Sequence, residues 1–226
     1  MGIRENIQEV REKVAEAANR AGRDPGAVKL VAVTKTVPVD KVMEAYNCGL
    51  RDFGESRAQE LLQKCGHLPP DANWHFIGTL QTNKVKKIIG RAGLIHSLDR
   101  IALAEEIDRA ARETGQVARV LLQVNIGSEE TKHGLPPGQL VSFAARVAGL
   151  PGLPVCGLMA IAPRCGEPGE MKPFFREMKA LFDQVKESVP GLFMRHLSMG
   201  MTGDYQVAVE EGATILRVGT AIFGAR

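Results

Sequence analysis

The stretch LVAVTKTVP, from Leu30 to Pro38, decides which fold the sequence predicts. Its first half is apolar at consecutive positions, which is typical of a strand buried on both faces in a parallel sheet. Its second half, TKTVP, lacks the glycines that normally follow the first strand of an open, doubly wound sheet and bind phosphate there. The stretch therefore favours a closed parallel barrel over an open sheet.

The alternation of strand and helix continues from this stretch in both directions. Before it, apolar residues recur at steps of three and four from Ile3 to Ala21, which predicts a helix that Gly22 ends. After it, amphipathic helical segments separate seven further strand candidates: Arg51–Gly54, Trp74–Gly78, Leu94–Leu98, Val120–Asn125, Val155–Ile161, Arg195–Met199 and Thr214–Val218. Strands that alternate with helices indicate a parallel sheet.

These elements predict an α/β fold, a (β/α)8 or TIM barrel with an extra N-terminal helix. The length of 226 residues is slightly below the roughly 250 that such barrels usually need, but within their range. No linker, repeat or low-complexity segment divides the chain, and the Pro/Gly-rich segment Pro163–Pro173 is interpreted as a loop. We therefore expect one domain over residues 1–226.

Charge and cysteine usage exclude several classes of protein. Lys and Arg outnumber Asp and Glu by 29 to 26, and this excess of +3 is scattered along helices, which argues against nucleic-acid binding. The N-terminus lacks the apolar region of a signal peptide, and no apolar run approaches the roughly 20 residues that span a membrane. The cysteines form no C-x-x-C pair, so no zinc or other metal site is expected: they are Cys48, Cys65, Cys156 and Cys165. A cytoplasmic protein with reduced thiols fits best.

Small and hydroxyl-bearing residues follow the last two predicted strands. In barrels, the loops after these strands commonly build a phosphate site at the carboxyl-terminal face. Ser198-Met199-Gly200-Met201-Thr202 follows one strand, and Gly219-Thr220 follows the other. Either segment alone would be interpreted as a small-residue turn, but together they indicate an anion site.

Lys35 ends the first strand, which would lie beside the eighth strand in a closed barrel. A lysine there commonly keeps its ammonium group in water. Beside a phosphate site, however, it could form an imine with the aldehyde of pyridoxal 5′-phosphate (PLP). Arg217, inside the eighth strand, could then face the pyridine nitrogen, or it could pair with a carboxylate such as Glu55.

Longer segments carry a resemblance that covers nearly the whole chain. Through these segments the sequence resembles the pyridoxal phosphate homeostasis protein family, whose barrel is similar to the N-terminal, PLP-binding domain of alanine racemases. The matching segments are LVAVTK, FGESRAQE, WHFIGTLQTNK, VNIGSEETKHG, GLMAIAP, LSMGMTGDY and ILRVGTAIFG.

The resemblance implies roles for individual residues. Lys35 would be the Schiff-base lysine and Arg217 would face the pyridine nitrogen. Ser198, Gly219 and Thr220 would bind the phosphate, with Met201 and Thr202 close by. Gln81, Asn83 and Lys84 match a family motif without an assigned role. Two residues depart from the family's pattern, because Ser56 replaces the usual Asn after F-G-E and Thr202 replaces a Ser.

The function that we expect is PLP binding in the homeostasis of intracellular PLP (vitamin B6) and amino acids, without catalytic residues. Arginine can only donate hydrogen bonds, so it leaves the pyridine nitrogen unprotonated and weakens the cofactor as an electron sink. Racemisation also needs a second acid/base group, which alanine racemases take from a further domain, and this sequence ends at Arg226.

We expect a monomer that binds PLP and passes it to candidate recipients, the apo-enzymes that require PLP. We expect it to bind neither nucleic acid nor membrane. One alternative is a weak PLP-dependent racemase or lyase, with His75, His133, His196 or Tyr205 as the acid. Another is a barrel that binds a phosphorylated ligand other than PLP, with Lys35 as an electrostatic contact.

Overall fold

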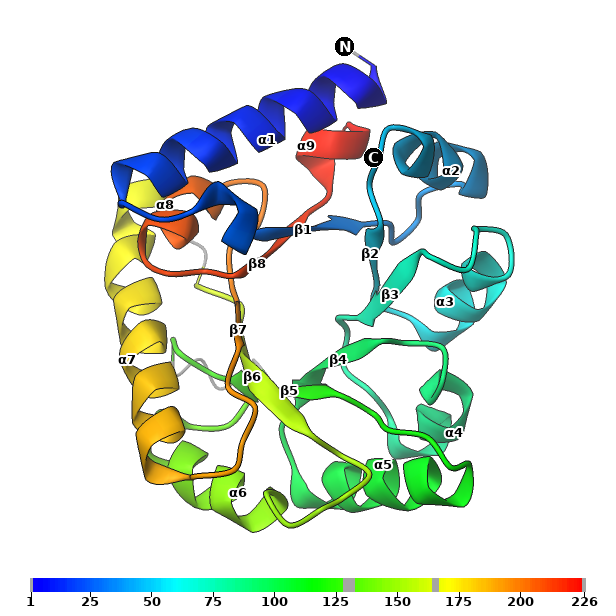
Figure 1. Cartoon of the computed structure of the whole chain (residues 1–226), viewed down its shortest axis with the longest axis vertical. Coiled ribbons are helices and arrows are strands. Elements are labelled where there is room, and N and C mark those ends of the chain that lie inside the picture. Colours follow the sequence, from blue (N-terminus) through cyan, green and yellow to red (C-terminus); the bar gives the residue numbers. More distant parts are fainter. Residues whose placement is uncertain (1, 128–132, 164–166, 225–226) are drawn as a thin grey trace.

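Eight parallel strands form a closed barrel in the order β1 to β8, and β8 pairs with β1 (Figure 1). The computed structural model describes residues 2–127, 133–163 and 167–224, so Cys165 and part of the motif VNIGSEETKHG lie outside the described residues. The strands are β1 (Lys29–Val33), β2 (Asp52–Glu55), β3 (Asn73–Phe76), β4 (Leu94–Leu98), β5 (Val120–Val124), β6 (Val155–Ala160), β7 (His196–Ser198) and β8 (Ile215–Val218). The predicted (β/α)8 barrel is confirmed.

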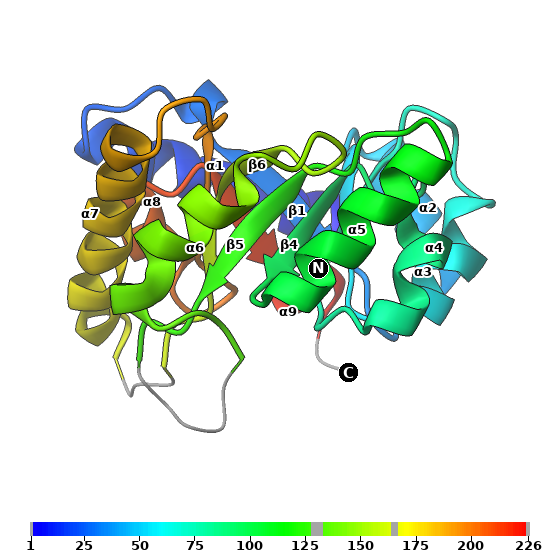
Figure 2. The same cartoon turned by 90° about the horizontal axis from the view of Figure 1, so that it is seen from below.

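The helices surround the strands on the outside of the barrel, as the side view in Figure 2 shows for α5, α6 and α7. The predicted N-terminal helix is confirmed as α1, which lies along α8 and α9. The helices are α1 (Ile3–Arg20), α2 (Val39–Asn47), α3 (Ala58–Cys65), α4 (Val85–Ile88), α5 (Ile101–Glu113), α6 (Leu140–Val147), α7 (Lys172–Ser188), α8 (Tyr205–Glu210) and α9 (Thr220–Phe223). None of them is long and apolar enough to cross a membrane.

Two predicted segments differ in detail from the structure. The helix expected over Asn83–Ile89 is divided into a 3-10 turn, η2 (Thr82–Lys84), and the short helix α4. The loop expected over Pro163–Pro173 is wrong for its second half, where η4 (Pro168–Met171) leads directly into α7. A capping box between Glu167 and Glu170 starts η4, and prolines are tolerated in the first turn of a helix because no intrahelical N–H bond is lost there.

The apolar core has two layers. The larger layer lies between the strands and the helices. The smaller layer fills the inside of the barrel: Val31, Leu94, Leu121, Cys156, Met159 and Ile215. Barrel interiors are usually packed with bulky apolar side chains. Here buried polar residues, among them His75, His96 and Arg217, accompany them.

Candidate functional site

The turn after β1 holds Lys35 in a constrained backbone. The next residue, Thr36, has φ +61°, the only positive φ among the described non-glycine residues. This region is costly for a β-branched side chain and persists only where neighbouring contacts enforce it. The N–H of Thr36 donates to Glu60 Oε2 at 2.8 Å, and Lys64 Nζ donates to the carbonyl of Thr34 at 2.7 Å. Helix α3 therefore fixes the backbone on both sides of Lys35, whose own side chain is exposed.

The group behind this turn is a buried ion pair. Glu55 is fully buried, and its Oε1 accepts hydrogen bonds from Lys64 Nζ at 2.7 Å and from the Thr34 hydroxyl at 2.6 Å. Lys64 also lies 3.4 Å from Glu60 Oε2, the atom that accepts from Thr36. Burial alone would raise the pKa of Glu60, but the N–H of Thr36 and the charge of Lys64 outweigh burial and lower that pKa overall. Glu55 thus pairs with Lys64 rather than with Arg217, the partner that the sequence left open.

Arg217 lies inside the barrel, 5% exposed, on the strand next to β1. Its Nη1 donates to Ser198 Oγ at 2.6 Å and its Nη2 to the carbonyl of Ala160 at 2.8 Å. No carboxylate of the described residues lies within ion-pair distance of it. Burial lowers the pKa of Arg217 to about 10, and the charge of Asp204 opposes that shift. The guanidinium is therefore a charged, enclosed donor with donor capacity left for a further acceptor.

Ser198 is fully buried, and its hydroxyl already has two contacts inside the barrel. It accepts from Arg217 and lies 3.0 Å from His96 Nδ1. A hydroxyl has one hydrogen to donate. Ser198 can consequently donate to a ligand only when that hydrogen is not used by His96.

The two segments expected to form a phosphate site lie next to each other. Thr202 Oγ1 accepts a hydrogen bond from the N–H of Ala221 at 3.4 Å, and the carbonyl of Gly200 accepts one from the N–H of Arg217 at 3.0 Å. Gly219 is the N-cap of α9, and Thr220 is its first residue. The structure thus brings 200–202 and 219–221 together at the carboxyl-terminal end of β8, beside the strand that leads to Lys35. Met201 is 37% exposed.

Of the cavities at the carboxyl-terminal side of the barrel, two adjoin each other. One, of about 320 Å³, is lined from β2, β3, β5 and β6 and their loops, by residues that include Ser56, Asn125 and His133. The other, of about 850 Å³, adjoins it through Ser56 and His133 and is lined also by Gln81 and Lys84. Neither is lined by Lys35 or by the residues expected at the phosphate.

The acids considered for catalysis are dispersed. Of the four, His133 lies at the carboxyl-terminal cavities. His196 lines a cavity of about 230 Å³ at the other end of the barrel, and His75 borders the same cavity. Tyr205 is buried at the start of α8. No three His, Cys, Asp or Glu side chains among the described residues could hold a metal ion.

The sequence analysis missed the interior partners of the candidate site. His96 and Asp52 carry no motif, and the prediction considered His75 only as a catalytic acid. A signal was nevertheless present, because His96 stands in the middle of the apolar strand LIHSL. A histidine at such a position must find polar partners inside the fold.

Comparisons with known proteins agree with this architecture. A family model described as the N-terminal domain of alanine racemase matches residues 3–226. The pyridoxal phosphate homeostasis protein of Aquifex aeolicus is 45% identical over 227 residues, which cover 100% of this chain and 99% of that protein. The chain belongs to the pyridoxal phosphate homeostasis protein family. The Escherichia coli member is 37% identical, over 99% of this chain and 97% of its own length.

Solved structures of other proteins share the barrel. PipY of Synechococcus elongatus, in a structure with PLP bound, superposes with a TM-score of 0.83 and is 38% identical over 93% of this chain and 100% of its own. A D-threonine aldolase from Filomicrobium marinum superposes with a TM-score of 0.78 over 98% of this chain and 60% of its own. At 18% identity, the aldolase shows likeness of fold alone.

Proposed function

We propose that this protein binds PLP as a Schiff base on Lys35, through one barrel domain over residues 1–226, and acts in cytoplasmic PLP and amino-acid homeostasis. The observation that carries the proposal is Arg217, a buried cation without a carboxylate partner among the described residues, on the strand paired with the one that leads to Lys35. Family membership supports it, as does the PLP-bound structure of PipY.

The register of β1 and β8 supports this assignment. Val31 lies opposite Arg217, so Lys35 follows four residues later in the direction in which Gly219 and Thr220 follow Arg217. Parallel neighbouring strands place these groups at one edge of the barrel. Arg217 would donate to the pyridine nitrogen, and Gly219, Thr220, Thr202, Ser198 and the Met201 segment would surround the phosphate.

The residues present fit a PLP site of low reactivity. When bound, PLP supplies an electron sink whose strength depends on protonation of its ring nitrogen. Arg217 keeps its own protons at neutral pH, since even its lowered pKa is about 10, so it would leave that nitrogen unprotonated. Together with the dispersed candidate acids, this supports a carrier without catalytic turnover. It would act as a monomer and pass PLP to apo-enzymes.

Reduction with borohydride tests the assignment of Lys35. We expect protein incubated with PLP, reduced and digested to carry the adduct on the peptide containing Lys35. Lys35→Ala should lose the covalent adduct yet retain part of its noncovalent PLP, while Lys41→Ala, which changes an exposed lysine of α2, should behave as the unaltered protein. An adduct on another lysine would refute the assignment, and α-proton exchange on amino acids that requires Lys35 would show an enzyme instead.

A further inference from the structure

A continuous row of hydrogen-bonded side chains crosses the inside of the barrel. It begins with Lys29 and Asp52 at the amino-terminal ends of β1 and β2 and ends with Arg217, where PLP is proposed to bind. The successive distances are Lys29 Nζ–Asp52 Oδ1 2.9 Å, Asp52 Oδ1–His75 Nε2 3.0 Å, His75 Nδ1–His96 Nε2 2.9 Å, His96 Nδ1–Ser198 Oγ 3.0 Å and Ser198 Oγ–Arg217 Nη1 2.6 Å.

The chemistry of these groups fixes the direction of every bond. Burial alone would raise the pKa of Asp52, but hydrogen bonds from His75 and Lys29 lower it overall, so Asp52 is an ionised acceptor. His75 must therefore carry hydrogen on Nε2, and when neutral it has only a lone pair on Nδ1. His96 must then donate from Nε2, which leaves its Nδ1 to accept the hydrogen of the Ser198 hydroxyl. Each group donates toward Asp52, and Ser198 has no hydrogen left for a ligand.

One additional proton reverses the central bonds. His75 with hydrogen on both nitrogens donates from Nδ1 to His96 Nε2, so neutral His96 carries its hydrogen on Nδ1 and donates to Ser198 Oγ. Relative to the first arrangement, His75 has gained a hydrogen on Nδ1 and His96 carries its hydrogen on Nδ1 in place of Nε2. The Ser198 hydroxyl keeps its hydrogen, which is now free to point at another acceptor. One proton is gained and none is lost.

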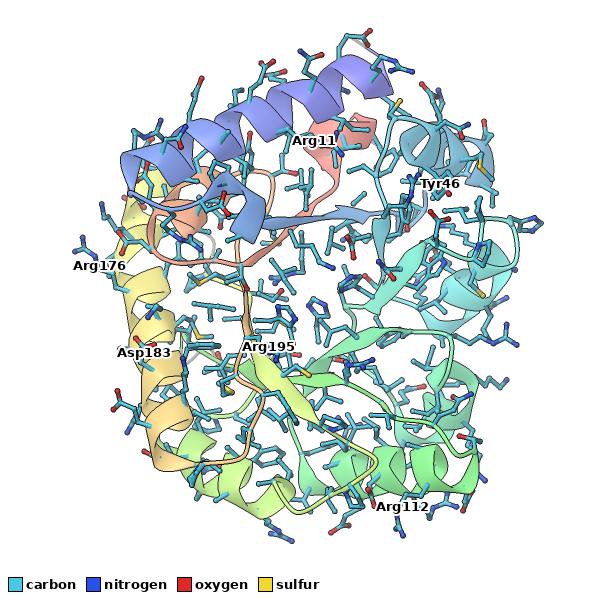
Figure 3. All side chains as sticks on the ribbon, in the orientation of Figure 1. Arg11, Tyr46, Arg112, Arg176, Asp183 and Arg195 are labelled. Carbon is cyan, nitrogen blue, oxygen red and sulfur yellow. The ribbon has the colours of Figure 1, made fainter. Side chains whose placement is uncertain are left out.

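The charges around the row decide where the added proton resides. His96 is fully buried, and burial, followed by the charges of His75, Arg217 and His196, lowers its pKa well below the ordinary value. His75 instead contacts the carboxylate of Asp52 and borders the cavity of about 230 Å³ at the amino-terminal mouth. The groups facing that mouth that oppose an added charge are Lys29, Arg119, Arg195 and His196. Figure 3 labels Arg195, which lies within the ring of strands in that view.

We propose that Asp52, His75 and His96 are positioning residues that control the hydroxyl of Ser198 beside Arg217. With His75 neutral, the hydroxyl is directed to His96; with His75 protonated, it is released toward the ligand that Arg217 contacts. The row thus links the protonation of a group at the amino-terminal mouth to a hydrogen-bond donor at the opposite end of the barrel interior. That the ligand is PLP rests on the proposed function, whereas the reversal itself is a property of the chain alone.

Nitrogen NMR on protein labelled with ¹⁵N in its five histidines, without PLP, tests the reversal directly, because imidazole ¹⁵N shifts distinguish the two neutral tautomers. We expect His96 to carry its hydrogen on Nε2 at high pH, and to shift it to Nδ1 in the same transition in which His75 becomes doubly protonated. His96 that keeps one tautomer throughout the titration of His75, or that carries hydrogen on Nδ1 at high pH, would overturn the proposal.

The affinity for PLP gives a second measurement, on purified protein with His75→Gln as the test and His67→Asn as the control. His67 is exposed and lies outside the row. PLP itself takes up protons as the pH falls, so the quantity to compare is the difference in PLP affinity between His75→Gln and the other two proteins at each pH. We expect the unaltered protein and the control to gain about three- to tenfold in affinity, relative to His75→Gln, as the pH falls through the transition. Equal pH profiles for all three would refute the link to the ligand.

The two measurements also separate this proposal from the proposed function. If borohydride places no adduct on Lys35 while the tautomer of His96 reverses as described, the PLP assignment fails and the switch stands. If the adduct forms on Lys35 but the tautomer does not change, the switch alone fails. The NMR titration uses the unaltered chain, so it does not depend on whether a buried variant such as His96→Asn folds.

Discussion

Arg217 is a single residue whose binding role can be separated from its structural role. A buried cation is costly to enclose, so its presence needs a compensating function. We expect Arg217→Met to keep a cooperative unfolding transition, because methionine fills a similar volume and adapts to irregular gaps. It should weaken PLP binding by about 10- to 100-fold, since a hydrogen bond from a charged donor is lost. Titration of PLP fluorescence or absorbance measures this.

Arg176 supplies the matched control for this substitution. It is an exposed arginine of α7, on the outside of the barrel, so Arg176→Met should leave the affinity for PLP unchanged. Equal affinities for PLP in Arg217→Met and the unaltered protein would show that the guanidinium does not contact the cofactor.

At the scale of elements, α3 and β2 hold the turn that carries Lys35 through one buried ion pair. Removing one partner of such a pair leaves an uncompensated charge and costs about 3–5 kcal/mol. We therefore expect Lys64→Met to lower the free energy of unfolding by about that amount, because Glu55 is left buried without its cationic partner. The double substitution Lys64→Met with Glu55→Gln should recover most of the loss. Urea denaturation measures both, and additive effects of the two changes would contradict the pairing.

The close approach of β6 and β7 depends on Gly157. Its φ is +149°, and a Cβ there would lie 1.8 Å from the carbonyl oxygen of His196. Gly157→Ala should therefore displace β7 and lower the free energy of unfolding by about 1–3 kcal/mol or more. Gly138→Ala, where a Cβ meets no atom within 4 Å, should change stability little. A Gly157→Ala protein as stable as the control would show that the strands can separate at no cost.

The barrel's elements were predictable because apolar periodicity reports local geometry, and the strand LVAVT and the helix over Ile101–Glu113 lie where their patterns place them. What sequence could not give are contacts across the interior. The place of Ser198 at the phosphate stays a prediction, whereas its contact with His96, which is 102 positions away, could not be read from the sequence. Such a contact depends on the register of several strands at once. The division of the expected helix over Asn83–Ile89 into the 3-10 turn η2 and the helix α4 was not predicted, because the apolar pattern does not distinguish a short 3-10 turn from an α-helical turn.

For the whole molecule, the buried histidines set how stability depends on pH. Burial is the first cause that lowers the pKa of His96 and of His196 in the folded state, whereas unfolding returns each to about 6.5. Below that value the unfolded chain binds more protons than the folded one. The contribution of these histidines to the free energy of unfolding is therefore fully present above about pH 6.5. It decreases as the pH falls, by at most about 1.4 kcal/mol per pH unit for each histidine.

Urea denaturation at several pH values between about 8 and 5 measures this slope. His196 is half-buried and solvent screens its charge, so His96 should contribute most of it. We expect His96→Asn, if it folds, to flatten the dependence, His196→Asn to flatten it slightly, and His67→Asn to leave it unchanged, because His67 is exposed in both states. Constant stability down to about pH 5 would mean that His96 is protonated inside the barrel as readily as in water. That result would be incompatible with a neutral His96 beside the guanidinium of Arg217, which is the electrostatic condition for placing the added proton on His75.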